Sequence, residues 1–295
     1  MQSRVFSLFL SLCLLGVSAT SHASSWYVSA TRAKNLYQQG AIVLDTRPHK
    51  HWNKQHIKTS LPLSWTTFSP NKQHRKGTLL PLRHLNKRLS ALGLRKNKAI
   101  LVVGNGWHGW GEDGRIVWML RSLGLKRVYF VNGGFQAAKK AGFPMTNKKT
   151  TPKTSTFKGN MRSRWSISRE TLHKIIKHKR KGWVFIDTRE RREYKGKTPY
   201  GEKRGGHLPG ALHLHFKRLM NKKGMVRSKK AIETLLSKKG ITKKSRIVAY
   251  CTGGIRSAWF VAVLQSLGYK HAKNYAGSMW EWSYYPAKTH PLEKN

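Results

Sequence analysis

The chain has 295 residues, enough for one large domain or two ordinary ones, and its 39% hydrophobic residues, with 11 tryptophans, exclude an intrinsically disordered protein. Lys and Arg number 58 against 11 Asp and Glu, a formal net charge of +47. That balance would indicate nucleic-acid binding, but the basic residues are spread along the whole chain and no aromatic-rich nucleic-acid motif accompanies them. We therefore expect non-specific attraction of small anions and polyanions, and no specific nucleic-acid partner.

Residues 1–23 are predicted to be a cleaved export signal. Arg4 precedes the apolar run Phe6–Val17, which is too short to span a bilayer comfortably, and Ser-His-Ala at positions 21–23 has the small-x-small pattern of a cleavage site. A lipoprotein signal around Cys13 is the alternative, although Leu12 stands where that signal needs a small residue. Because no later segment is apolar enough to be transmembrane, we expect a periplasmic or secreted protein.

An internal repeat divides the rest of the chain. The segment Ile42–Arg47 recurs as Val184–Arg189, and Ser122–Gly124 recurs as Ser266–Gly268, with about 145 residues between copies. Such a spacing indicates two duplicated domains, which we place at residues 26–145 and 166–290. Residues 146–165 are rich in Lys, Thr and Ser and are predicted to be the linker.

Each copy alternates short apolar runs with helical patterns. The pattern predicts an α/β fold in which two tandem domains each have a mainly parallel sheet flanked by helices. One helix, Leu79–Leu92, has Leu82, Leu85, Leu89 and Leu92 on one face. The predicted strands of the first copy are Ile42–Leu44, Ile100–Val103 and Val128–Val131, and further helices are predicted at Ile116–Leu123 and Ala258–Leu267.

The loop after the strand Ile100–Val103 is rich in glycine. Its first residue, Gly104, aligns with Cys251 of the second copy, so the first domain lacks that thiol. Glycines 104, 106 and 109 have the spacing of a dinucleotide-binding turn, but no acidic residue follows at the distance where one would bind a ribose, and no cofactor is expected. Trp107, His108 and Trp110 either line the active-site cleft or pack against their surroundings.

In the second copy a strand ending at Tyr250 continues directly into a cysteine loop and then into a helix. Cys251 is the one cysteine left after removal of the signal, so the mature chain cannot form an internal disulfide. Glycines let backbone N–H groups turn toward the sulfur, and the helix N-terminus and Arg256 favour the thiolate. The loop reads Cys251, Thr252, Gly253, Gly254, Ile255, Arg256 and Ser257.

This loop resembles the active-site loop of the rhodanese family, and three further segments of the second copy resemble that family's motifs in the same order. A first motif is followed by a Gly-His-Leu-Pro-Gly-Ala turn and by a closing element with tryptophan. The three segments are Asp187–Gly196, Gly206–Ala211 and Gly277–Trp282.

The resemblance implies a sulfurtransferase in which Cys251 is the nucleophile and Arg256 assists it, while Thr252, Gly253, Gly254, Ile255 and Ser257 hold the substrate. The implied partners are a small anionic sulfur donor, thiosulfate-like, and a thiol or cyanide acceptor. A phosphatase or arsenate reductase is an alternative, but those loops place five residues between Cys and Arg, and here four intervene. A protein that binds persulfides or polyanions without turnover is a second alternative.

Two departures from the family pattern leave the donor unpredicted. Many two-domain members have an arginine at the position of Glu193, and thiosulfate-preferring members have a basic residue where Thr252 stands. Asp45 and Asp187, which end strands before Thr-Arg, are expected to hold arginine and backbone in place. No metal site is expected, because the pairs His49/His51 and His213/His215 lack a Cys or carboxylate at ligand spacing.

Overall fold

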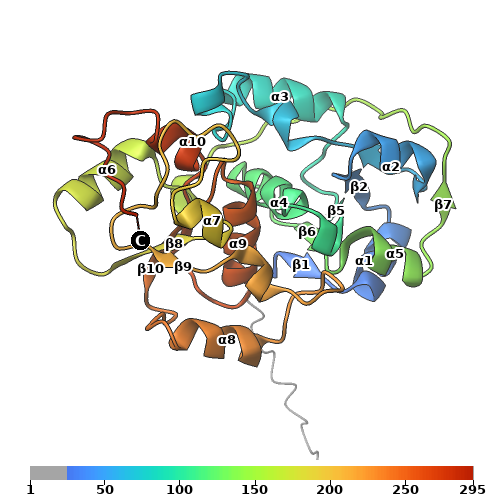
Figure 1. Cartoon of the computed structure of the whole chain (residues 1–295). Helices are drawn as coiled ribbons and strands as arrows, with labels where there is room; N and C mark the ends of the chain where they lie inside the picture. Colours follow the sequence, from blue (N-terminus) through green and yellow to red (C-terminus); the bar gives the residue numbers. More distant parts are fainter. Residues whose placement is uncertain (1–24, 295) are drawn as a thin grey trace, which may run out of the picture.

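The computed structural model describes residues 25–294 as two α/β domains lying side by side, the first drawn in blue to green and the second in yellow to red (Figure 1). The predicted export signal at 1–23 lies outside the described residues. Within residues 25–294 no helix is both long and apolar enough to cross a membrane.

The first domain is built on five parallel strands in the order β1-β6-β5-β2-β4. Ile100 and Val102 face one side of this sheet and Leu101 and Val103 the other, and all four side chains are fully buried. A separate antiparallel pair joins β3 to β7. The strands are β1 (Tyr27–Val28), β2 (Ile42–Asp45), β3 (His56–Ile57), β4 (Leu61–Pro62), β5 (Ile100–Val103), β6 (Val128–Val131) and β7 (Met145–Thr146).

Helices cover both faces of this sheet. Apolar residues of α1 (Ala30–Gln38) and α5 (Gly134–Lys140) pack on one face, and those of α3 (Leu82–Ala91) and α4 (Glu112–Ser122) on the other. The short helix α2 (His49–Lys54) follows β2.

The prediction for helix α3 was wrong at its start by three residues. The helix begins at Leu82, because Pro81 holds the N-cap position and the residue before a proline is disfavoured in the α conformation. Its apolar face is confirmed, since Leu85 and Leu89 are fully buried and Leu82 and Leu92 pack against the same core.

The second domain repeats this plan with strands in the order β11-β10-β8-β9. Ser166 pairs in parallel with Asn274, at the place that β1 occupies in the first sheet. Helices α6 and α10 cover one face and α8 and α9 the other, which confirms the predicted pair of α/β domains. The elements are α6 (Arg169–Lys177), β8 (Trp183–Asp187), α7 (Arg191–Tyr194), β9 (Leu212–His213), α8 (Lys229–Ser237), β10 (Arg246–Tyr250), α9 (Ile255–Ser266), β11 (Ala272–Asn274) and α10 (Ser278–Trp282).

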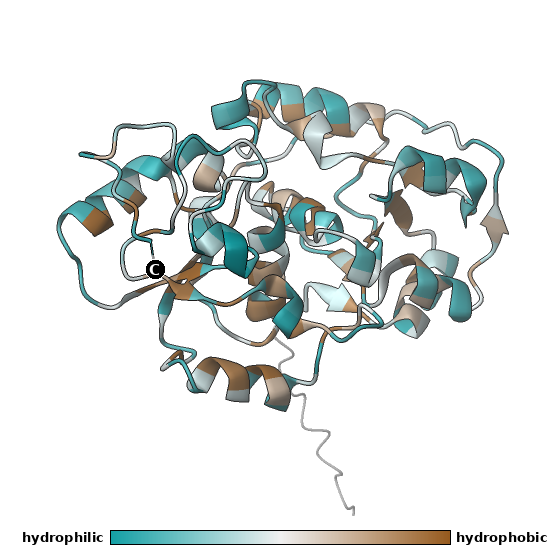
Figure 2. Ribbon diagram, viewed as in Figure 1, coloured by the Kyte–Doolittle hydropathy of each residue, from teal (hydrophilic) through white to brown (hydrophobic). Residues whose placement is uncertain are grey.

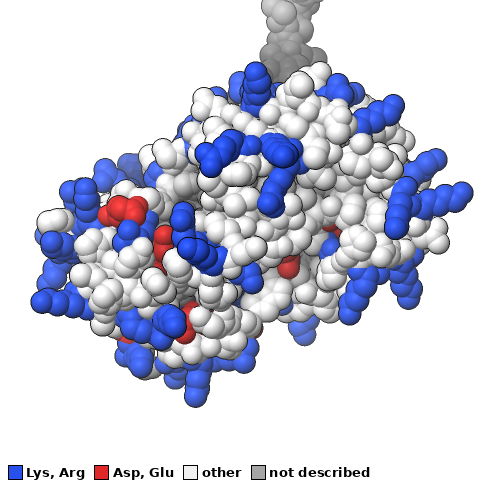
Figure 3. Space-filling view, turned by 90° about the horizontal axis from the view of Figure 1, so that it is seen from above, with Lys and Arg blue, Asp and Glu red and all other residues white. Residues whose placement is uncertain are grey.

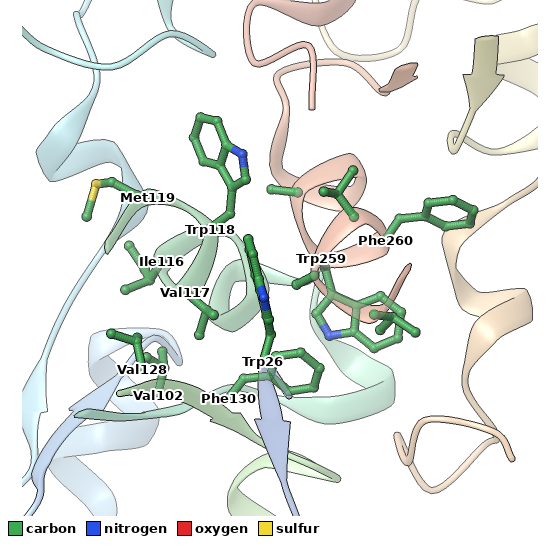
Figure 4. Close-up of a cluster of buried hydrophobic side chains, with 14 of the residues drawn as sticks. Trp26, Val102, Ile116, Val117, Trp118, Met119, Val128, Phe130, Trp259 and Phe260 are labelled. Carbon is green, nitrogen blue, oxygen red and sulfur yellow. The ribbon is translucent and has the colours of Figure 1, made fainter. Parts of the chain in front are cut away.

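The two domains share one hydrophobic core. Helices α4 and α9 pack against each other between the two sheets, and Figure 4 shows Trp26 and Phe130 of the first domain close to Trp259 of the second. This contact is tight, because a Cβ added to Gly114 would lie 2.5 Å from the Cα of Trp259. A rigid interface of this kind fixes the loops that precede α4 and α9 relative to each other.

Between the domains the chain runs along helix α3 and is tied to it. The backbone N–H of Ser155 donates to the carbonyl of Ser90, and that of Phe157 donates to the Ser90 hydroxyl. Phe157 is buried in the shared core.

Polarity follows this layered plan. Hydrophobic segments gather on the strands and the inward faces of helices, while the outer loops are hydrophilic (Figure 2). On the face seen in Figure 3, Lys and Arg are scattered widely and acidic side chains are few, in keeping with a net charge of +47.

Candidate active site

The sheet register places Gly104 and Cys251 at equivalent positions. Asp45 lies opposite Val103 at the end of β5, and Asp187 lies opposite Tyr250 at the end of β10. The residue after each of these strand ends is Gly104 in the first domain and Cys251 in the second, as the repeat predicted. The Cys251 thiol therefore stands at the carboxyl edge of a parallel sheet, where ligands bind in α/β folds.

The loop after Cys251 folds its backbone around the sulfur. The N–H of Gly254 donates to Cys251 Sγ at 3.1 Å, and the Ser257 hydroxyl lies 3.6 Å from the same atom. Gly254 has φ of +76°, and a Cβ there would lie 2.4 Å from the Ala276 carbonyl oxygen. Glycine is thus required at this position for the turn that aims the N–H at the sulfur.

These contacts favour the thiolate. Burial raises the pKa of Cys251, but the Arg256 guanidinium and the N–H and O–H groups of Ser257 oppose it, so the pKa lies below its ordinary value. The thiol is only 1% exposed, so water does little to screen these charges.

A strained residue holds the backbone of Cys251. Ser278 has φ of +52°, a region that residues other than glycine seldom adopt, and its hydroxyl accepts the N–H of Cys251 at 3.0 Å. The N–H groups of Met279 and Trp280, at the start of α10, donate to the carbonyls of Cys251 and Thr252. The closing motif thus holds the backbone of the cysteine loop in place.

Arg256 is held by an acidic partner rather than pointing freely into the cleft. Its two terminal nitrogens donate to the Glu193 carboxylate at 2.6 and 2.8 Å, and one also donates to the Thr252 hydroxyl at 2.5 Å. The Thr252 hydroxyl in turn donates to Glu193 at 2.7 Å. Burial raises the pKa of Glu193, but Arg256 and Thr252 outweigh burial and hold this pKa below its ordinary value, so the pair is ionised.

The expectation for the strand-end aspartates is confirmed. Asp187 accepts from the backbone N–H and the guanidinium of Arg189, and Asp45 does the same for Arg47. Arg189 also donates to the Gly206 carbonyl at 2.6 Å, which ties the first motif to the Gly-His-Leu-Pro-Gly-Ala turn.

A buried arginine of the first domain binds the cysteine loop of the second. Arg115, on α4 and 1% exposed, donates to the Gly254 carbonyl at 3.3 Å and to the Gly77 carbonyl at 2.7 Å. Burial lowers the pKa of Arg115 to about 10, and attraction to Cys251 opposes that fall, so the guanidinium stays charged at neutral pH. Gly77 itself packs so closely that a Cβ there would lie 2.8 Å from the Gly253 carbonyl oxygen.

A cavity of about 230 Å³ opens above the thiol between the domains. Cys251 and its loop form the floor, and aromatic side chains from both domains form the walls. The Arg256 guanidinium lies 4.9 Å from the ring centroid of Trp110 and 5.7 Å from that of Tyr200. The lining residues are Trp65, Trp110, Glu112, Tyr200, Cys251, Thr252, Gly253, Ile255, Arg256 and Trp280.

The equivalent place in the first domain is filled by a carboxyl group. A Cβ added to Gly104 would lie 2.5 Å from Oδ2 of Asp113, which is 6% exposed. Burial raises the pKa of Asp113 to about 7. The first domain therefore lacks both the thiol and the space for one.

Each residue predicted from the cysteine loop except Ser257 lines the cavity or forms its turn, and the Ser257 hydroxyl lies beneath it, 2.7 Å from Asn274 Oδ1. Of the three aromatic candidates in the first domain, Trp110 lines the cavity, whereas Trp107 packs against the core and His108 is exposed. Within residues 25–294 no three His, Cys, Asp or Glu side chains are placed to hold a metal ion.

The contacts of several site residues could not be predicted from the sequence. Ser278 and Trp280 belong to the closing motif, but nothing in that motif predicts their contacts to Cys251 and Gly253. Trp65, Tyr200 and Arg115 lie outside every motif, and packing between distant segments brings them to the cleft.

Solved structures with the same fold include the enzyme EanB, with a TM-score of 0.79 and 19% identity over 92% of this chain and 69% of that one. The anaerobic ergothioneine biosynthesis enzyme of Chlorobium limicola, solved with trimethyl histidine, has a TM-score of 0.79 and 19% identity over 92% of this chain and 70% of that one. At this identity the likeness shows the fold.

Relatives in sequence include the sulfur carrier protein TtuD of Thermus thermophilus, 30% identical over 66% of this chain and 72% of its own. A thiosulfate sulfurtransferase of Azotobacter vinelandii is 28% identical over 70% of this chain and 74% of its own, and one of Mus musculus is 24% identical over 91% and 86%. The model of the rhodanese-like domain matches residues 29–141 and again 168–284, and the chain therefore belongs to the rhodanese family as a tandem of two such domains.

Proposed function

We propose that this protein is a sulfurtransferase that carries a sulfane sulfur as a persulfide on Cys251. The observation that carries the proposal is the position of the thiol, which accepts the Gly254 N–H at 3.1 Å on the floor of a cavity of about 230 Å³. Sulfur transfer is also the activity in the names of the relatives from Azotobacter vinelandii and mouse.

The reaction divides into two displacements. The Cys251 thiolate attacks the terminal sulfur of a small anionic donor, an S–S bond forms to Sγ, and the rest of the donor leaves with the electron pair of the broken bond. A thiol or cyanide then attacks the outer sulfur and releases the Cys251 thiolate. The N–H groups around Sγ stabilise negative charge on the persulfide as they do on the thiolate.

We further propose that the protein is exported and acts in the periplasm or outside the cell. The proposal rests on the charged, apolar and small-residue pattern of residues 1–23. Mass spectrometry of the protein purified from its natural host tests it, since cleavage after Ala23 predicts a mature chain that begins at Ser24. A chain that keeps residues 1–23 would contradict export by this signal.

Mass spectrometry also tests the chemistry. Incubation with a sulfane donor should add about 32 Da, the mass of one sulfur atom, and a thiol or cyanide should remove it. Cys251→Ser should abolish the adduct and any turnover, while Ser257→Ala, which keeps the nucleophile, should still form it. Turnover by the Cys251→Ser variant would show that another group is the nucleophile.

A further inference from the structure

The charged residues that line the cavity disfavour a donor with two negative charges. Among the described residues that line it, Arg256 alone is positively charged, and Glu112 adds a carboxylate. Both terminal nitrogens of Arg256 already donate to Glu193, which is fully buried, and one donates to Thr252 as well. A donor that carries two negative charges therefore meets a guanidinium whose charge is already matched within the protein.

The walls of the cavity are aromatic instead. Trp65 and Trp110 come from the first domain, and Tyr200 and Trp280 from the second. Trp110 and Tyr200 lie edge to face with centroids 5.1 Å apart, while Trp65 and Trp280 are stacked at 6.4 Å. Such rings bind planar and apolar groups through their faces.

The cavity also has room for more than a small inorganic ion. Its volume of about 230 Å³ equals roughly seven or eight water molecules at about 30 Å³ each. The excess space lies between aromatic rings rather than beside hydrogen-bond donors, so it suits the body of an organic molecule.

We propose that the donor is an organic sulfane compound with a planar or apolar body and at most one negative charge at its reactive end. This inference rests on the proposed persulfide function. The four aromatic rings hold the body of the donor. Glu193 is a positioning residue that excludes dianions because it pairs with Arg256. The strongly positive net charge, +47 for the full sequence, draws anions toward the protein in general, and the cavity then selects among them.

Three donors separate the contributions of charge and body. Thiosulfate carries two negative charges, methanethiosulfonate carries one with a small body, and benzenethiosulfonate carries one with an aromatic ring. With the thiosulfonates, the Cys251 thiolate attacks the terminal sulfur, the new S–S bond forms, and the bond to the sulfonyl sulfur breaks as a sulfinate leaves with its electron pair. No further oxidant or reductant is needed.

The measurement is the second-order rate constant of persulfide formation in single turnover by the mature protein. Each value is divided by the rate of the same donor with a free small thiol, which removes differences in intrinsic reactivity. The normalised rate constant for benzenethiosulfonate should exceed that for methanethiosulfonate by about tenfold, the ratio that stacking on aromatic rings supplies. The normalised rate constant for methanethiosulfonate should in turn exceed that for thiosulfate.

Two variants test the two causes separately. Trp110→Ala should lower the ratio of the benzenethiosulfonate rate constant to the methanethiosulfonate rate constant by about threefold or more. Trp107→Ala, in the same loop but outside the cavity, should leave this ratio unchanged. Glu193→Gln should raise the rate constant for thiosulfate relative to that for methanethiosulfonate by about threefold or more, because Arg256 loses its charged partner. Each readout is a ratio within one variant, so a partial loss of folded protein does not affect it.

The outcomes distinguish the two proposals. If no donor at any concentration adds sulfur to Cys251, the proposed function fails. If every donor adds sulfur but thiosulfate is the fastest, or the benzene and methane donors react equally, the function stands and the donor class is wrong. If Glu193→Gln leaves the ratio of the thiosulfate and methanethiosulfonate rate constants unchanged, the role given to Glu193 is wrong.

Discussion

Replacement of Arg115 tests whether the first domain supports the thiolate of the second. In Arg115→Met the side chain keeps much of its volume but loses its charge and its bonds to the carbonyls of Gly77 and Gly254. Gly254 keeps a second donor, the Asn274 side chain at 3.2 Å, whereas no other hydrogen bond to the Gly77 carbonyl is seen within the described residues. The variant should therefore be destabilised and its thiol less acidic.

The magnitude follows from these contacts. A hydrogen bond from a charged donor contributes about 1.5–3 kcal/mol, and burying a carbonyl without a partner costs about 1–3 kcal/mol, so we expect a loss of about 2–4 kcal/mol in the free energy of unfolding. For a chain of this size that corresponds to a fall in Tm of roughly 5–15 °C. Loss of a positive charge disfavours the thiolate, so the pKa of Cys251 should rise, by less than for loss of Arg256.

The assay is the pH dependence of Cys251 alkylation, with thermal unfolding followed by circular dichroism. Arg121→Met is the matched control, because Arg121 is a buried arginine of the same helix that donates to the carbonyls of Val128 and Ser25, both outside the second domain. Arg121→Met should lower Tm without moving the alkylation midpoint. If Arg115→Met shifts that midpoint no more than Arg121→Met does, Arg115 only supports the fold and the electrostatic argument is refuted.

Three further predictions concern the interface and the place in the first domain that is equivalent to Cys251. Gly114→Ala should lower the free energy of unfolding by about 1–2 kcal/mol net, because overlap with the Cα of Trp259 at 2.5 Å outweighs the better helix propensity of alanine; an unchanged urea midpoint would contradict this. Gly104→Cys, in a Cys251→Ser background, should gain no sulfur adduct by mass spectrometry, because the Asp113 carboxyl occupies the space; an adduct at position 104 would show that the site is still open. The raised pKa of Asp113, about 7 against an ordinary 3.8, means that the folded state keeps a proton that the unfolded state releases, so stability should fall by about 4 kcal/mol between about pH 4 and pH 7. Asp113→Asn should remove that fall from a plot of Tm against pH, and a variant with the wild-type profile would assign it to other groups.

The fold and the position of the cysteine loop at a strand end could be predicted from the sequence because both depend on local patterns. Short apolar runs mark the strands, and the recurrence of Ala99–Val103 as Arg246–Tyr250 is enough to align Gly104 with Cys251. The turn around the sulfur is likewise local, since Gly254 and the start of α9 follow the thiol within a few residues.

The walls of the cleft could not be predicted in the same way. Trp107 and Trp110 are three residues apart in one glycine-rich loop, and the turn η3 (Gly106–His108) together with the positive φ of Gly111 decides which of them faces the cavity. Such turns have no periodicity to detect. The pairing of Glu193 with Arg256 spans 63 residues, and nothing in either motif states that the two side chains meet.

The first domain has no thiol at position 104 and still lines the cavity above Cys251. Its glycine-rich loop forms a wall of that cavity and presents Trp110 to the side of the cleft that holds the sulfur. The close packing of Gly114 on Trp259 holds this loop at a fixed position relative to the second domain. Arg115 leaves the same helix to bind the loop that follows Cys251, so the helix that fixes the domains also places a positive charge near the thiol. Donor selection and thiolate formation therefore depend on both domains in this proposal, although the proposed covalent steps take place on Cys251 alone.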